Sequence, residues 1–145
     1  MDQTEKFLEN SEAVQAHLNI IQSVIQRMSA NSASAKAWCI TLVSAILVIV
    51  ADKGKANFTW IALIPTILFL VLDAYYLGLE KAFRDSYNNF IIKLHNKKLI
   101  ASDLFAVTPS GSLFKHFMKS LISFSVWPFY LTLILMIFLA GKYLL

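Results

Sequence analysis

Residues 58–79 have the sequence FTWIALIPTILFLVLDAYYLGL, and this stretch decides the fold class. It is about 22 residues long, which is enough for a helix to cross a hydrocarbon core of about 30 Å. The only charged residue in it is Asp73. Length and polarity together predict that residues 58–79 form a membrane-spanning helix.

Two further apolar runs lie on either side of this stretch. Ala37–Ala51 is about 15 residues long and reaches a full span if the helix extends back over residues 33–36, with the Lys36 ammonium turned toward water. Leu121–Ala140 is about 20 residues long and contains Pro128, where we expect a kink. A re-entrant hairpin broken at Pro128 is the alternative for this run. The pattern predicts an all-α integral membrane protein with three transmembrane helices.

Composition supports lipid as the solvent of these runs. The chain has 145 residues, of which 57% are hydrophobic and 15% are charged. A soluble core of this size cannot bury so much apolar surface, so three core helices of a soluble protein are the weaker alternative. The composition also excludes a disordered chain, and the single cysteine, Cys39, excludes an internal disulfide.

Basic residues set the expected orientation. The segment Glu80–Ser120 is rich in lysine and arginine, whereas the link Asp52–Asn57 has only two lysines. The positive-inside rule therefore places the N-terminus and residues 80–120 in the cytoplasm. The net charge of +4 fits this basic face, and we do not expect a nucleic-acid partner. The predicted parts are a cytoplasmic amphipathic helix (1–32), a two-span hairpin (33–79), a cytoplasmic helix, turn and short helix (80–120), and a third span with an outer C-terminus (121–145).

The N-terminal arm carries an apolar stripe. We expect an amphipathic helix over residues 4–28, capped by Thr4 and followed by a joint at residues 29–34. A second stripe follows the predicted second span, on residues 83–94. The two stripes predict antiparallel packing within one chain, an oligomeric coiled coil, or a helix lying on the bilayer. The arm stripe consists of Val14, Leu18, Ile21, Ile25 and Met28.

Asp73 is the candidate functional residue. A carboxylate roughly 10 Å inside a span is costly unless it is protonated, paired or hydrated. Lys36 is the first candidate partner and Arg27 the second, and the carboxylate is interpreted as a structural clamp or as a pore-lining group. We expect no catalytic residues, no metal site and no cofactor, because the sequence has no nucleophile motif, phosphate loop or zinc-like spacing. The histidines, which we expect to be solvated, are His17, His95 and His116.

Two stretches, IIQSVIQRMSANSASAKAW (20–38) and LDAYYLGLEKAFRDSY (72–87), resemble the two-span SLATT-type membrane proteins of bacterial and archaeal conflict systems. The resemblance covers roughly residues 15–90, and the third apolar run departs from it. It implies that matching residues at the end of the second span serve in assembly. These residues are Asp73, Tyr75, Tyr76, Glu80, Phe83 and Arg84.

The resemblance also implies a function. It suggests a homo-oligomeric effector of anti-phage defence in the bacterial inner membrane, which disrupts the bilayer when a soluble partner on the cytoplasmic face signals infection. The alternative is a non-conducting membrane anchor or adaptor that recruits a soluble defence complex. A third hypothesis, a nucleotide-binding sensor, rests on Lys93, Lys97, Lys98, Lys115 and His116.

Overall fold

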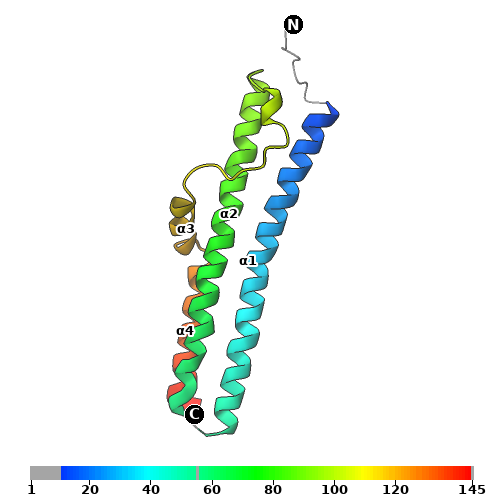
Figure 1. The fold of residues 1–145 in the computed structure, drawn as a ribbon. Coiled ribbons are helices and arrows are strands. Elements are labelled where there is room, and N and C mark those ends of the chain that lie inside the picture. The colour runs from blue at the N-terminus through cyan, green and yellow to red at the C-terminus, as the bar shows by residue number, and fades with distance from the viewer. Residues whose placement is uncertain (1–10, 55, 145) are drawn as a thin grey trace.

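The computed structural model describes residues 11–54 and 56–144. Two long helices, α1 (Glu12–Asp52) and α2 (Leu63–His95), lie antiparallel and side by side (Figure 1). A short connection that includes the 3-10 helix η1 (Ala56–Ala62) joins them at one end. The described residues contain helices and no strand, which confirms the all-α class.

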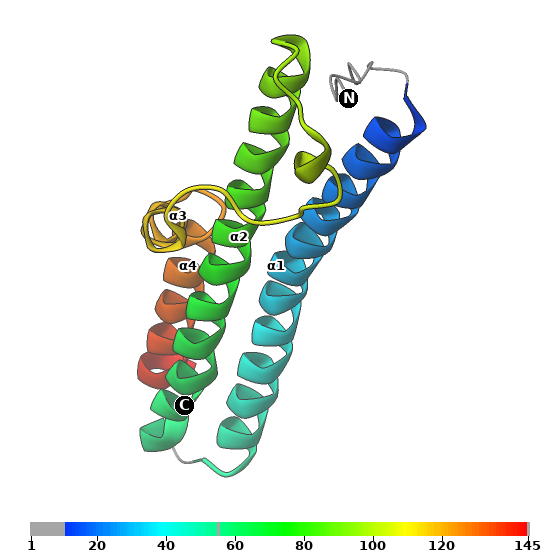
Figure 2. The ribbon, with the colours of Figure 1, turned by 45° about the horizontal axis from the view of Figure 1, so that its top comes forward.

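The remaining elements pack on this pair. After the 3-10 turn η2 (Ala101–Asp103), the chain forms α3 (Leu113–Leu121), α4 (Trp127–Leu139) and the π-helical end η3 (Ala140–Leu144). Figures 1 and 2 show α3 near the middle of α2 and α4 along the part of α2 that leads to η1. We call residues 37–79 and 121–144 the apolar half, and residues 11–36 and 80–120 the polar half.

Two helical segments are long and apolar enough to cross a membrane. They are Glu12–Asp52 and Asn57–His95. In the most apolar 18-residue stretch of each segment, only 22% and 28% of the stretch is buried inside the chain. The third predicted span is the shorter apolar helix Trp127–Tyr143. A continuous helix over Leu121–Ala140 is wrong, because the chain turns between the end of α3 and the start of α4. Pro128 lies in the first turn of α4, where its missing N–H has no partner to lose, so it makes no kink inside the helix.

The joint expected at residues 29–34 is also wrong, because α1 runs through it without interruption. Serine and asparagine cost only about 0.5 kcal/mol each inside a helix relative to alanine, and the stretch has no proline or glycine. Ser32 and Ala35 are buried against the rest of the chain. Tertiary packing therefore outweighs the weak local preference for a break.

The start of α1 differs from the expected one. The helix begins at Glu12, and Ser11 is its N-cap, with the Ser11 hydroxyl accepting a hydrogen bond from the Val14 N–H. An uninterrupted helix over residues 4–28 is therefore wrong at Ser11. The expected cap Thr4 lies outside the described residues. The second long helix, α2, continues beyond the apolar run to His95, as predicted.

Each half has its own apolar core. In the apolar half, buried side chains of α1, η1 and α4 meet, among them Cys39, Val43, Ala62 and Tyr130. In the polar half, Val14 packs against Phe90 and Leu94. Both cores hold α1 in place, so one continuous helix links two separately packed regions.

Candidate functional site

Asp73 lies on α2 where the apolar and polar halves meet, and its side chain is fully buried. It faces two residues of α1. The Ser32 hydroxyl donates a hydrogen bond to Asp73 Oδ1, and Lys36 Nζ lies 2.6 Å from Asp73 Oδ2. Lys36 Nζ also donates to Ser32 Oγ over 3.4 Å. The three side chains form a closed polar cluster between the two long helices, which we call the Asp73 cluster.

Helix periodicity brings the Asp73 cluster together. Ser32 and Lys36 are four residues apart, so both lie on the face of α1 that meets α2. Lys36 is the first partner named from the sequence, and it is the residue beside Asp73. Arg27 is exposed and makes no ion pair with Asp73. Ser32, which lies in the joint predicted at residues 29–34, is the partner that sequence analysis missed.

Burial makes the Asp73 cluster energetically tight. Within the described residues, Asp73 Oδ2 has no hydrogen-bond donor besides the ion-paired Lys36. The Lys36 side chain is only 19% exposed and its ammonium pairs with the buried Asp73, so the expected turn of this ammonium toward water is wrong. Removing one partner of such a buried pair costs about 3–5 kcal/mol, because the other charge stays buried alone.

A second contact ties α4 to α2 beside the Asp73 cluster. The buried Tyr130 hydroxyl donates a hydrogen bond to the carbonyl of Phe69 over 2.9 Å. Phe69 lies one helical turn before Asp73 on α2. Cys39, one turn after Lys36 on α1, is fully buried and packs near Tyr130 in the apolar core. The Asp73 cluster is thus closed on its apolar side by α4.

The other residues of the sequence resemblance extend from Asp73 along α2. Arg84 Nε donates to Glu80 Oε1 over 2.9 Å, and the Glu80 side chain is only 11% exposed. Tyr75 is exposed at 47%, whereas Tyr76 and Phe83 are half-buried. The structure therefore leaves Tyr75 and Arg84 on the outside of the chain and turns Glu80 inward.

The arm stripe packs within the chain. Val14 and Ile21 are buried, and Leu18, Ile25 and Met28 are half-buried. Val14 and Leu18 belong to the cluster with Phe90 and Leu94 of α2. This is the antiparallel packing inside one chain, one of the three arrangements that the stripes predicted.

His17 was expected to be solvated, and this expectation is wrong, because only 1% of the residue is exposed. Its Nδ1 accepts a hydrogen bond of 2.9 Å from the Phe105 N–H, and its ring centroid lies 4.2 Å from that of Phe90. Burial lowers the pKa of His17, and the charge of Asp103 opposes that shift. His17 follows Val14 by three residues and precedes Ile21 by four, so its position on the apolar stripe was the signal for burial.

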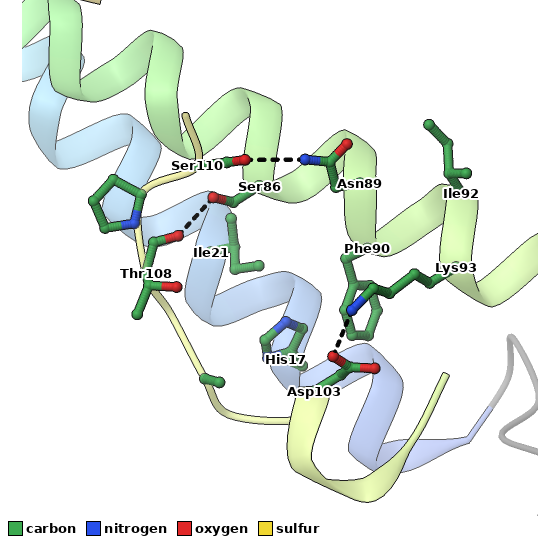
Figure 3. Close-up of a pocket in the computed structure, with 12 residues that line it drawn as sticks. His17, Ile21, Ser86, Asn89, Phe90, Ile92, Lys93, Asp103, Thr108 and Ser110 are labelled. Carbon is green, nitrogen blue, oxygen red and sulfur yellow. Dashed lines mark hydrogen bonds and ion pairs between the residues drawn. The ribbon is translucent and has the colours of Figure 1, made fainter. Parts of the chain in front are cut away.

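The loop over residues 96–112, which we call the strap, closes over His17. The Lys93 Nζ–Asp103 Oδ1 distance is 2.7 Å, Ser86 Oγ donates to the Thr108 carbonyl over 2.6 Å, and Asn89 Nδ2 donates to Ser110 Oγ over 3.0 Å (Figure 3). Lys93 also lowers the pKa of Asp103. Phe105 has a φ of 61°, a left-handed conformation that is strained for a side chain of this size. Under the strap lies a cavity of about 550 Å³, into which His17 points.

His116 is also less solvated than expected. Its side chain is 15% exposed, and Nε2 lies 3.4 Å from Asp85 Oδ2. His95 is exposed at the end of α2. Within residues 11–54 and 56–144, no three His, Cys, Asp or Glu side chains come close enough to hold a metal ion.

Comparison of the chain with protein-family models, with curated proteins and with solved structures finds no match. The functional argument therefore rests on the Asp73 cluster, the strap and the apolar surface.

Proposed function

We propose that the chain is a membrane protein whose apolar half lies in lipid. The observation that carries this proposal is the exposure of large apolar side chains on the outer faces of α1 and α2. Val48 and Ile64 are both 68% exposed, and Leu68 is 64% exposed. Soluble monomers rarely leave such patches larger than a few hundred Å², whereas lipid solvates them at no cost.

Three crossings fit this placement. The segment Trp127–Tyr143 is about 26 Å long at 1.5 Å per residue, close to the thickness of a hydrocarbon core. It packs beside α2 (Figure 2), and Trp127 is exposed at its start, where interfacial tryptophans are common. The positive-inside rule then places the polar half and the N-terminus in the cytoplasm, and the C-terminus outside.

We infer further that the chain is an oligomeric effector that disrupts the bacterial inner membrane during anti-phage defence. The resemblance of residues 20–38 and 72–87 to SLATT-type proteins supports this role. The Asp73 cluster supplies a physical switch. In the closed chain its charges neutralise each other between α1 and α2, and parting the two helices exposes a carboxylate and an ammonium to neighbouring copies. Exchanged pairing between copies would then line an opening.

A specific observation favours the second candidate, a non-conducting anchor or adaptor. Polar side chains of the spans satisfy themselves on their own helix: Thr41 donates to the Ala37 carbonyl, Thr66 to Ala62 and Thr132 to Pro128. With Asp73 enclosed as well, the described chain presents little polar surface to line a hydrated pore. An adaptor would instead use the strap and the polar half to bind its soluble partner.

Leakage of a dye from liposomes that contain the purified protein separates the two functions. The effector predicts leakage that Asp73→Leu abolishes, and Asp52→Leu is the matched control because the Asp52 side chain is 76% exposed. In cells, the same pair of variants should differ in growth arrest during infection. An oligomer that never leaks, with any partner present, overturns the effector and leaves the adaptor.

A further inference from the structure

The seat of α3 on α2 brings two lysines to the boundary between the two halves. A Cβ atom at Gly78 would lie 3.1 Å from the backbone nitrogen of Phe117, so only glycine allows α3 to approach this closely. About two turns further along α2, Asp85 Oδ2 lies 3.4 Å from His116 Nε2. These two contacts fix the position and the direction of α3 against α2.

Lys81 lies between these two contacts on α2. It follows Gly78 by three residues and precedes Asp85 by four, so it shares the face that meets α3. On α3, Lys119 lies about one turn after His116 and is close enough to Lys81 for the two charges to interact. Burial lowers the pKa of Lys81, Glu80 opposes that shift, and Lys119 adds to it.

Neither lysine has an ion-pair partner within the described residues, and Glu80 favours the charge of Lys81 only through space. Lys81 and Lys119 make no ion pair there, and the nearest carboxylate on α2, Glu80, is bound by Arg84. The charge of Lys119 raises the free-energy cost of the charge on Lys81, because the packed helices hold the two ammonium groups near each other. A bound anion between them would remove that cost.

Large apolar side chains are exposed on α3 and in the turn that follows it. On α3, Phe114 is 72% exposed, and in the turn that follows α3, Ile122 and Phe124 are 75% and 83% exposed. Met118 and Trp127 are exposed as well. Ammonium groups among exposed aromatic and aliphatic side chains are typical of the boundary between lipid headgroups and acyl chains.

We propose that Lys81 and Lys119 together bind the headgroup phosphate of an anionic phospholipid, whose acyl chains lie against Phe114, Ile122 and Phe124. The lipid belongs to the leaflet on the side of the polar half. Bound there, it bridges α2 and α3 and fixes the level of the turn between α3 and α4 in the bilayer. This inference rests on the membrane placement proposed above, and it is independent of whether the protein conducts.

The test is native mass spectrometry of the full chain in detergent, with phosphatidylglycerol or phosphatidylcholine added. The wild-type protein should retain phosphatidylglycerol about thirtyfold better than phosphatidylcholine, the size expected for two lysines at an anionic headgroup. Lys81→Gln/Lys119→Gln should lose this preference, and Lys81→Arg/Lys119→Arg should keep it. Lys97→Gln/Lys98→Gln, which removes the same charge from the exposed strap, is the matched control and should also keep it.

Two results overturn the inference. One is equal retention of both lipids by the wild-type protein, which needs no variant to fold. The other is retention of phosphatidylglycerol by the Gln double variant at the wild-type level. An excess of inorganic phosphate should leave the lipid adduct intact, and its displacement by phosphate would show a general anion site instead. A chain that is a soluble monomer without detergent refutes the membrane placement itself, which is a separate failure.

Discussion

Asp73 and His17 are both buried ionisable side chains, and the two halves of the molecule bury them in opposite ways. At the boundary of the apolar half, Asp73 is buried beside the Lys36 ammonium, so its negative charge is balanced by a positive charge. In the polar half, the His17 ring is buried in contact with Phe90, and its Nδ1 accepts a hydrogen bond from a backbone N–H. This ring is satisfied by a hydrogen bond and not by an opposite charge. Both contacts join α1 to the rest of the chain, and they should fail under different conditions.

This comparison predicts that the Asp73 cluster is the more costly to break. Lys36→Met leaves the Asp73 carboxylate buried without its counter-charge and should destabilise the protein by about 3–5 kcal/mol. Thermal unfolding of the detergent-solubilised protein at neutral pH measures it. Lys36→Met/Asp73→Leu should recover most of the loss, because no charge then remains buried.

The matched control for this prediction is Lys53→Met. Lys53 also pairs with an aspartate, Asp52, but both side chains are largely exposed and 3.9 Å apart, so the midpoint should hardly move. Equal effects of Lys36→Met and Lys53→Met would show that the Asp73 cluster is not a clamp.

The apolar packing of the polar half should come next in size. Ile21 is 2% exposed, and Ile21→Ala should cost about 2–3 kcal/mol through lost contacts and a residual cavity. Ile20→Ala, at a neighbouring position that is 42% exposed, should change stability much less. Ile21→Glu should separate the arm from α2, which hydrogen exchange at residues 12–28 would show. Unchanged exchange in that variant would mean that the stripe is not what holds the arm.

The His17 contact should make stability depend on pH. Its pKa is lowered in the folded chain, so the unfolded chain takes up the proton first as the pH falls. Stability is therefore full above the unfolded pKa of about 6.5 and is lost as the pH falls below it. Unfolding midpoints at pH 7.5 and pH 5.5 should differ more for the wild-type protein than for His17→Gln.

His95 supplies the control for this pH dependence, because it is exposed and its replacement by glutamine should leave the dependence in place. A pH dependence that survives in His17→Gln but disappears in His95→Gln would contradict this assignment to His17.

The smallest effect should come from the Glu80–Arg84 pair. The Arg84 side chain is 61% exposed and that of Glu80 is 11% exposed, so water screens one partner of this i,i+4 pair and its contribution should stay below about 1 kcal/mol. Arg84→Gln should therefore leave the unfolding midpoint almost unchanged. A change in oligomer size without a change in midpoint would place Arg84 in assembly, as the resemblance implies.

The broad features of the fold could be predicted from the sequence, because the apolar runs are long and the stripe on the arm is periodic. Asp73 and its partner Lys36 could also be predicted. A carboxylate inside an apolar run is unusual, and Lys36 lies near the same end of the first apolar run. The straight course of α1 through residues 29–34 could not be predicted, since those small polar residues have weak preferences that only packing decides.

The burial of His17 was missed, whereas Asp73 was found, because of the sequence around each residue. A histidine in a polar stretch looks ordinary, and its burial depends on the strap, whose Phe105 comes from a distant part of the chain. The break between α3 and α4 was missed because residues 122–126 alternate apolar residues with serines and contain no proline or glycine to mark a turn. Its position depends on how α3 seats against Gly78, a contact that no local pattern shows.

Thiol labelling of two single-cysteine variants tests the central claim, that the apolar half lies in lipid. Val48→Cys and Ile20→Cys, in a Cys39→Ala background, replace side chains that are 68% and 42% exposed on the surface of the isolated chain. In membranes opened to reagent on both sides, a membrane-impermeant maleimide should modify position 20 and leave position 48 unmodified until detergent is added. Modification of position 48 without detergent, at a rate equal to or faster than that of position 20, would contradict the account.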